Sequence, residues 1–171
     1  PISICSADPD AGTFTILVKL IGPGTRLLGA MRPGTPVDML APLGTSFTWQ
    51  AQGPMVLVAG GVGVAPMVFL ARSVRAQFPE GQAPRIHFCY GARSADDFVM
   101  LEEIHRVCDE LVLTTNDGSM GARGFVTEAA ERLLTPGTQV FTCGPNPMMS
   151  DLLRRMRAVG LEGQVSLENM M

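Results

Sequence analysis

Glycine-rich and polar turns that follow apolar stretches carry the residues whose types and spacing are suited to chemistry. The first turn, residues 60–66 (GGVGVAP), follows MVLVA and opens an apolar stretch of helical character. Gly60, Gly61 and Gly63 allow close backbone approach to a ligand, and the amides at a helix start favour a phosphate or pyrophosphate. Because Pro66 stands where G-x-G-x-x-G has its third glycine, a tight strand-to-helix turn without a ligand is the alternative.

Two further turns bear on nucleotide choice. Arg93 lies in YGARS, after RIHFC, and Asp117 lies in TNDGS, after ELVL. An acidic side chain beyond a strand can accept hydrogen bonds from ribose hydroxyls and repels a 2′-phosphate, so Asp117 favours NAD over NADP. An Asp-Gly pair is also an ordinary turn signal, and Arg93 is able to bind a phosphate, which favours the opposite choice.

The fourth turn, CGPNPM, follows TQVFT and places Cys143 before Gly144 and Pro145. Its prolines indicate a rigid turn that presents Cys143 at the end of a strand. A lone cysteine is commonly a small buried hydrophobe, and neither His87 nor His105 belongs to a pattern that would activate it as a nucleophile. The position beyond a strand keeps a functional role open.

The elements that position these turns alternate between apolar strands and helical stretches in the second half of the chain. The alternation predicts an α/β domain over residues 54–171, with a parallel five-stranded sheet and helices on both faces. In such a sheet, ligands bind beyond the carboxyl ends of the strands. Residues 1–53 instead have strands (ISICSA, TFTILVKLI, PVDMLAP) between Gly- and Pro-rich turns, with a short helical TRLLGAM that Thr25 would cap.

Composition excludes several classes of protein. The chain has 171 residues, of which 46% are hydrophobic and 17% charged, so a disordered chain and a disulfide miniprotein are excluded. Its net charge of −3 without a basic stripe argues against nucleic-acid binding. The four cysteines have no C-x-x-C spacing, so no metal site is expected, and they suit a reducing cytoplasm. Glycines interrupt the longest apolar stretch, and the start lacks signal-peptide features, so we expect neither a membrane span nor a leader.

The motifs together resemble the ferredoxin–NADP reductase superfamily. The resemblance runs over the whole chain in order and rests on PISI, GPGT, PLG, GGVGVAP and CGPNPM. Within the superfamily, TNDGSMGARGFVTE and VSLE are most similar to the electron-transfer subunit of dihydroorotate dehydrogenase type B and its near relatives.

The resemblance implies part of an antiparallel FAD-binding β-barrel over residues 1–53 and an NAD(P)-binding domain over residues 54–171. It implies that FAD contacts Pro1, Ile2, Ser3, Val18, Lys19, Leu20, Gly24 and Thr25. Cys143 and Glu168 resemble in placement the family's residues near the junction of nicotinamide and flavin.

Two departures from the family pattern concern the ends of the chain. The family's FAD strand begins with an Arg that would precede Pro1, and the earlier barrel strands are absent. The near relatives also continue into a cysteine-rich loop with a [2Fe–2S] cluster, whereas this sequence stops at Met171. We therefore expect a chain truncated at both ends, with the cluster in the full-length parent.

The resemblance implies a cytoplasmic flavoprotein subunit that moves a hydride between NAD(H) and FAD. An iron–sulfur centre would pass electrons to a catalytic partner in a hetero-oligomer. The partner expected first is the dihydroorotate dehydrogenase catalytic subunit of pyrimidine biosynthesis. The alternatives are a reductase subunit of a sulfide dehydrogenase, hydrogenase or NADH-dependent ferredoxin:NADP oxidoreductase, and a non-catalytic nucleotide-binding or assembly module.

Overall fold

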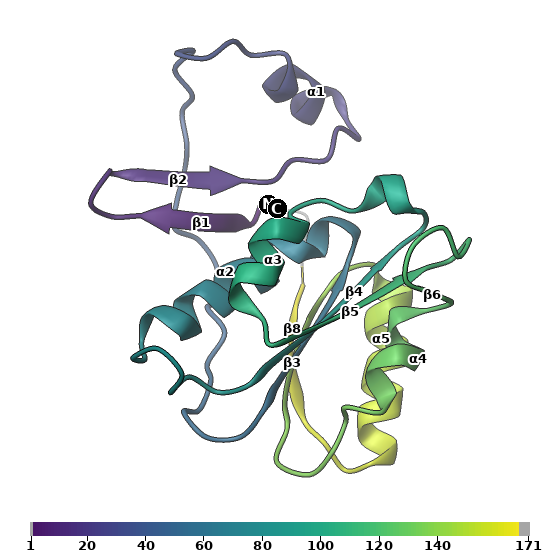
Figure 1. Ribbon diagram of the computed structural model, residues 1–171. Helices are drawn as coiled ribbons and strands as arrows, with labels where there is room; N and C mark the ends of the chain where they lie inside the picture. Colours follow the sequence, from purple (N-terminus) through teal and green to yellow (C-terminus); the bar gives the residue numbers. More distant parts are fainter. Residues whose placement is uncertain (1, 168–171) are drawn as a thin grey trace.

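A parallel sheet forms the centre of the molecule. The structure, a computed structural model, describes residues 2–167 (Figure 1). The strands lie in the order β6-β5-β4-β3-β7-β8, all parallel. They are β3 Met55–Gly60, β4 Ile86–Ala92, β5 Glu110–Thr115, β6 Ala122–Arg123, β7 Gln139–Cys143 and β8 Gly163–Ser166. The five predicted strands are confirmed, and the two-residue β6 adds a sixth at the edge that the sequence did not indicate.

Helices cover both faces of this sheet, as predicted (Figure 1). One face carries α2 (Val64–Ala76) and α3 (Leu101–Val107), and the other carries α4 (Val126–Glu131) and α5 (Asn146–Ala158). Short 3-10 turns, η1 (Gly61–Gly63) and η2 (Ala95–Asp97), follow β3 and β4. The segment DDFVMLEEIHRV, residues 96–107, predicts one continuous helix, and this prediction is wrong: the backbone breaks after η2, and Met100 takes a left-handed φ of 61° before α3 begins.

The core has two layers because successive side chains of a strand point to opposite faces. In β3, Met55, Leu57 and Ala59 pack toward α2, while Val56 and Val58 pack toward α4 and α5. All five are fully buried, which explains the unbroken apolar run of this central strand. β3 therefore ends at a fixed place, and the turn after it is held on both sides.

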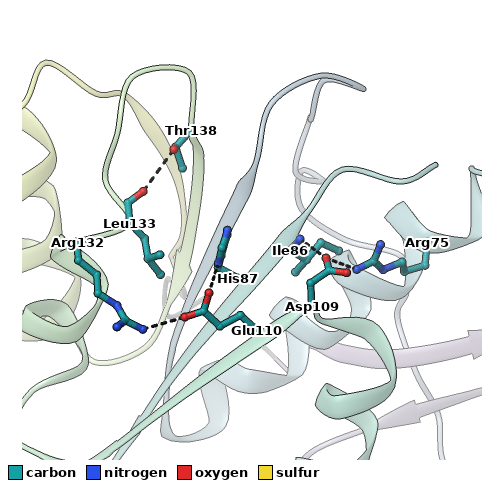
Figure 2. A network of polar contacts seen from close by, with 8 residues as sticks. All are labelled: Arg75, Ile86, His87, Asp109, Glu110, Arg132, Leu133 and Thr138. Atoms are coloured by element: carbon teal, nitrogen blue, oxygen red, sulfur yellow. Dashed lines mark hydrogen bonds and ion pairs between the residues drawn. The ribbon is translucent and has the colours of Figure 1, made fainter. Parts of the chain in front are cut away.

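Ion pairs fasten the amino ends of β4 and β5 (Figure 2). Asp109 accepts hydrogen bonds from the Ile86 backbone N–H at 2.7 Å and the Arg75 guanidinium at 2.6 Å. Glu110 lies 2.9 Å from His87 Nδ1 and 2.8 Å from Arg132. These contacts lie at the end of the sheet opposite to the turns, so His87 joins β4 to β5 away from the turn that carries Cys143.

The first part of the chain is a small unit beside α2. It contains an antiparallel pair, β1 (Ile4–Asp8) and β2 (Thr13–Ile16), and the helix α1 (Pro23–Gly29). The strand predicted at residues 36–42 is wrong, because the segment begins and ends with proline and pairs with no strand among residues 2–167. Gly22, not Thr25, is the N-cap of α1, since Pro23 already occupies the first helical position.

Candidate functional site

A groove of about 910 Å³ runs along the carboxyl ends of the strands. Its walls come from the turns after β3, β4, β5 and β7, from the first turns of α4 and α5, and from residues 17–19, which follow β2 in the first unit. The chain crosses from β5 through β6 and α4 to β7, on the other side of β3, so the strand order reverses beside β3. Such a switch point is where open α/β sheets bind ligands. The lining residues include Leu17, Val18, Lys19, Gly61, Val62, Arg93, Asn116, Phe125 and Pro145.

The glycines of the turn after β3 serve different purposes. Gly61 has a left-handed φ of 54°, and a Cβ placed there would meet no atom of residues 2–167 within 4 Å. A Cβ at Gly60 would instead lie 2.8 Å from Pro145, and one at Gly63 would overlap the carbonyl of Cys143. Gly60 and Gly63 are thus required by packing against the turn after β7, while Gly61 leaves space over the groove. Pro66 lies inside α2 and does not line the groove.

The turn after β7 supports the floor of the groove. Thr142 donates a hydrogen bond of 2.9 Å to the carbonyl of Val58, which fastens β7 to β3 near their ends. A Cβ at Gly144 would lie 3.0 Å from the backbone nitrogen of Gly60, so the two turns pack backbone to backbone. Cys143 is buried at the end of β7, within the α2-side core, and Pro145 beyond it lines the groove.

The turns after β4 and β5 are tied to each other. Asp117 accepts hydrogen bonds from the Ser119 backbone N–H at 2.9 Å and from its hydroxyl at 2.6 Å. The Ser119 hydroxyl in turn accepts the Ala95 N–H at 2.8 Å. The hydrogen bonds from Ser119 hold the pKa of the Asp117 carboxyl below its usual range, so it is charged at neutral pH. The neighbouring Asn116, not Asp117, lines the groove, and Arg93 lines it from the turn after β4.

The cationic side chains of the groove differ in whether they form ion pairs. The side chains of Lys19 and Arg93 form no ion pair within residues 2–167. Arg155 is held by Asp151 at 2.8 Å and by Glu131. A hydrogen bond from Thr127, together with those from Arg155, lowers the pKa of Asp151, while Asp151 raises the pKa of Arg155. Lys19 and Arg93 are therefore the groove's cations that remain free to face an anionic ligand.

Sequence reasoning missed the wall formed by the start of α4. Phe125 precedes this helix, lines the groove and is 62% exposed. Its ring forms no aromatic pair with another ring of the described residues. The segment GFVTE, directly after the two residues of β6, carries this wall and is visible in the sequence. Its place next to the turn after β4 depends on how the chain crosses from β5 to β7.

The first unit contributes only some of the predicted cofactor residues to the groove. Val18 and Lys19 line it, whereas Ile2, Ser3, Leu20, Gly24 and Thr25 do not. The Thr25 hydroxyl accepts the backbone N–H groups of Ile21 and Gly22 and donates to the Gly22 carbonyl, so it closes the start of α1. Pro1 and Glu168 lie outside the described residues.

Two further properties concern metals and membranes. Residues 2–167 contain no group of three or more metal-ligating side chains. Within the same range, each helix is too short or too polar to cross a lipid bilayer.

A family model described as the oxidoreductase NAD-binding domain matches residues 57–154. The chain is also similar to proteins named dihydroorotate dehydrogenase B (NAD(+)), electron transfer subunit. It is 32% identical to that of Desulforamulus reducens and 34% identical to that of Fusobacterium nucleatum. Both similarities cover 100% of this chain but only 64% and 65% of the relative. The chain thus spans somewhat less than two thirds of these relatives.

Two solved structures with the same fold are an oxidoreductase and a reductase by name. The structure of an NADH-dependent reduced ferredoxin-NADP oxidoreductase matches with a TM-score of 0.86 and 29% identity, covering 100% of this chain and 61% of that one. The ferredoxin reductase of carbazole 1,9a-dioxygenase matches with a TM-score of 0.73 and 22% identity, covering 96% and 54%. The second similarity concerns the fold alone.

Proposed function

Because the chain belongs to the oxidoreductase NAD-binding domain family, we propose that its groove binds NAD(H) and exchanges a hydride with FAD held by the first unit. The observation that carries the proposal is that one groove is lined both by the glycine turn of the sheet and by Val18 and Lys19 of the first unit. The resemblance to the ferredoxin–NADP reductase superfamily and to dihydroorotate dehydrogenase B electron-transfer subunits is confirmed.

The turn after β3 suits a pyrophosphate. Gly61 leaves open space where a side chain would stand, so a phosphate can approach the backbone before α2. Lys19 and Arg93 supply positive charge that no ion pair among residues 2–167 engages. The exposed ring of Phe125, which also lines the groove, is available to stack on an adenine base.

The end of β2 suits a flavin in contact with the nicotinamide. A bound flavin supplies the ring that accepts or returns a hydride. Val18 and Lys19 line the same groove as the glycine turn, so they would hold that ring against the nucleotide. Cys143 would support the nicotinamide site from the end of β7. The roles of Pro1, Ile2, Ser3, Leu20, Gly24, Thr25 and Glu168 at the flavin remain predictions.

Nucleotide choice would depend on charge at the turns after β4 and β5. Asp117 is ionised and sits next to Asn116, which lines the groove, so its charge opposes a 2′-phosphate nearby. Asp96 and Asp97 add negative charge to the same end of the groove. Arg93 attracts a phosphate there. With three carboxylates against one guanidinium, the balance favours NAD(H).

The proposed partner is a dihydroorotate dehydrogenase catalytic subunit in a cytoplasmic hetero-oligomer, with electrons passing through a [2Fe–2S] cluster. The names of the full-length relatives support this choice. The described residues offer no cluster ligands, so the cluster would be bound by another part of the protein. The structural similarity of 29% identity to an NADH-dependent ferredoxin-NADP oxidoreductase supports the second candidate partner system.

Anaerobic titration of the flavin-loaded protein with NADH tests the proposal. We expect NADH to bleach the visible flavin band, and the Gly61→Ala variant to require more NADH for the same bleaching. A protein that binds FAD but is not reduced by NADH would contradict hydride exchange. Adding dihydroorotate dehydrogenase and dihydroorotate, or reduced ferredoxin with NADP, then distinguishes the two partner systems by which mixture turns over.

A further inference from the structure

Two glutamine side chains join the sheet to the segment that leads back from the first unit. This crossing segment, residues 47–52, has no regular secondary structure. The Gln164 carboxamide on β8 accepts the Thr48 backbone N–H at 2.9 Å and donates to the Thr48 carbonyl. The Gln139 carboxamide on β7 accepts the Gln50 N–H at 2.7 Å and donates to the carbonyls of Gln50 and Gln52, both at 3.0 Å.

Both side chains act in place of a neighbouring strand. A strand binds its neighbour through alternating N–H and C=O groups, and a carboxamide offers one acceptor and two donors. Each glutamine bonds the N–H and the C=O of the same residue, Thr48 or Gln50. These bonds join positions 116 and 89 residues apart in the sequence.

Aromatic contacts seat the same segment on the α2 side of the core. The rings of Phe47 and Phe141 meet edge to face with centroids 5.6 Å apart. Those of Trp49 and Phe78 lie 5.8 Å apart. A Cβ at Gly53 would lie 2.5 Å from the Gly137 carbonyl, so the chain turns back into β3 in close backbone contact. The crossing segment is therefore fixed to the core by ring contacts and close backbone packing.

The crossing segment affects the groove because it is one of two places where the first unit is anchored to the core. Residues 18–46 contain no buried residue. On the near side of this stretch, Cys5 is buried and Leu17 packs against the core. On the far side, the anchor is the crossing segment. Val18 and Lys19, which line the groove, follow directly after the first anchor.

We propose that Gln139 and Gln164 are positioning residues, whose carboxamides clamp the crossing segment and thereby set how the first unit faces the nucleotide groove. The inference rests on the proposed function for its effect on hydride transfer. The clamp itself can be measured without any cofactor, because Trp49, the single tryptophan of the chain, lies within the clamped segment.

The test uses the full-length protein with Gln139→Met and Gln164→Met, separately and together. Methionine keeps the length of the side chain but has neither the oxygen that accepts the Thr48 and Gln50 N–H groups nor the N–H donors to the backbone carbonyls. Gln82→Met, on an exposed loop, is the matched control because the Gln82 side chain forms no hydrogen bond within the described residues. We expect the Thr48 and Gln50 amides to exchange about 10-fold faster in the double variant, as for loss of one or two ordinary hydrogen bonds. We also expect Trp49 emission to shift to longer wavelength.

The functional arm measures NADH affinity and flavin reduction separately. We expect the double variant to bind NADH as the wild type does and to reduce flavin about 10-fold more slowly, because orientation is lost and the binding groups remain. Unchanged exchange and emission would overturn the clamp. A loosened clamp with a wild-type reduction rate would overturn the positioning role. A wild type that reduces no flavin would overturn the proposed function, while exchange at Thr48 and Gln50 would still decide on the clamp.

Discussion

The Gly61→Ala substitution separates ligand binding from turn formation. Gly61 has a left-handed backbone with open space around the position of a Cβ. An alanine there costs about 1 kcal/mol in backbone strain but clashes with no atom of the described residues. Its methyl group would stand where we place the pyrophosphate, and losing one charge-assisted contact of about 1.5–3 kcal/mol weakens binding about 10- to 100-fold. We therefore expect a small loss of stability and a large loss of NADH affinity.

Two other glycines provide the controls. Gly81 has a φ of 77° and open space, but it lies on the loop before β4, away from the groove. Gly81→Ala should cost the same stability and leave NADH binding unchanged. At Gly63, a Cβ would overlap the Cys143 carbonyl, so Gly63→Ala should lose about 3 kcal/mol or more through overpacking.

Urea unfolding and calorimetric titration with NADH measure the two quantities for each variant. The decisive comparison is NADH affinity in Gly61→Ala against Gly81→Ala. Equal affinities in these two variants would show that residues 60–66 form a tight turn without a ligand, and the pyrophosphate assignment would be refuted.

Three further predictions concern single side chains. Asp117→Asn keeps an oxygen that accepts the Ser119 hydrogen bonds but removes the charge, so NADPH affinity should rise while NADH affinity stays the same. Competition binding measures the ratio of the two affinities, and an unchanged ratio would show that Asp117 does not determine nucleotide choice. Cys143→Ala should leave a folded protein that reduces flavin more slowly in stopped-flow measurements, and a wild-type rate would make Cys143 a packing residue alone. The pKa of Asp151 is lowered in the folded state, so the stability it contributes is present above its unfolded pKa of about 3.9 and is lost as the pH falls below that value. Asp151→Asn should therefore lower the melting temperature at pH 7 and flatten its fall below about pH 4, and parallel wild-type and variant curves would contradict this.

The sheet could be predicted from sequence because its signals are local. MVLVAG is apolar throughout since both faces of β3 are covered. The stretch after it repeats its apolar residues at helical spacing. The first unit was harder. PVDMLAP has the apolar residues of a strand, but Val37, Met39 and Leu40 are exposed because the described part of the chain provides no partner strand for the segment.

The candidate site was predictable only where the sequence marks the ends of strands. The glycine turn and the Cys143 turn come together because β3 and β7 are neighbours. The division of labour among the glycines is not visible in the sequence, since Gly63 is required by the carbonyl of a residue 80 positions away. Similarly, Asn116 rather than Asp117 lines the groove because Ser119 draws the Asp117 carboxylate into its own turn.

A crystal structure of the flavin-loaded, full-length protein with bound NAD⁺ tests the central claim most directly. Our account predicts the pyrophosphate over Gly61, the adenine near Phe125, and the nicotinamide facing the flavin beside Val18 and Lys19. A dinucleotide bound outside the groove, or a nicotinamide turned away from the first unit, would contradict it.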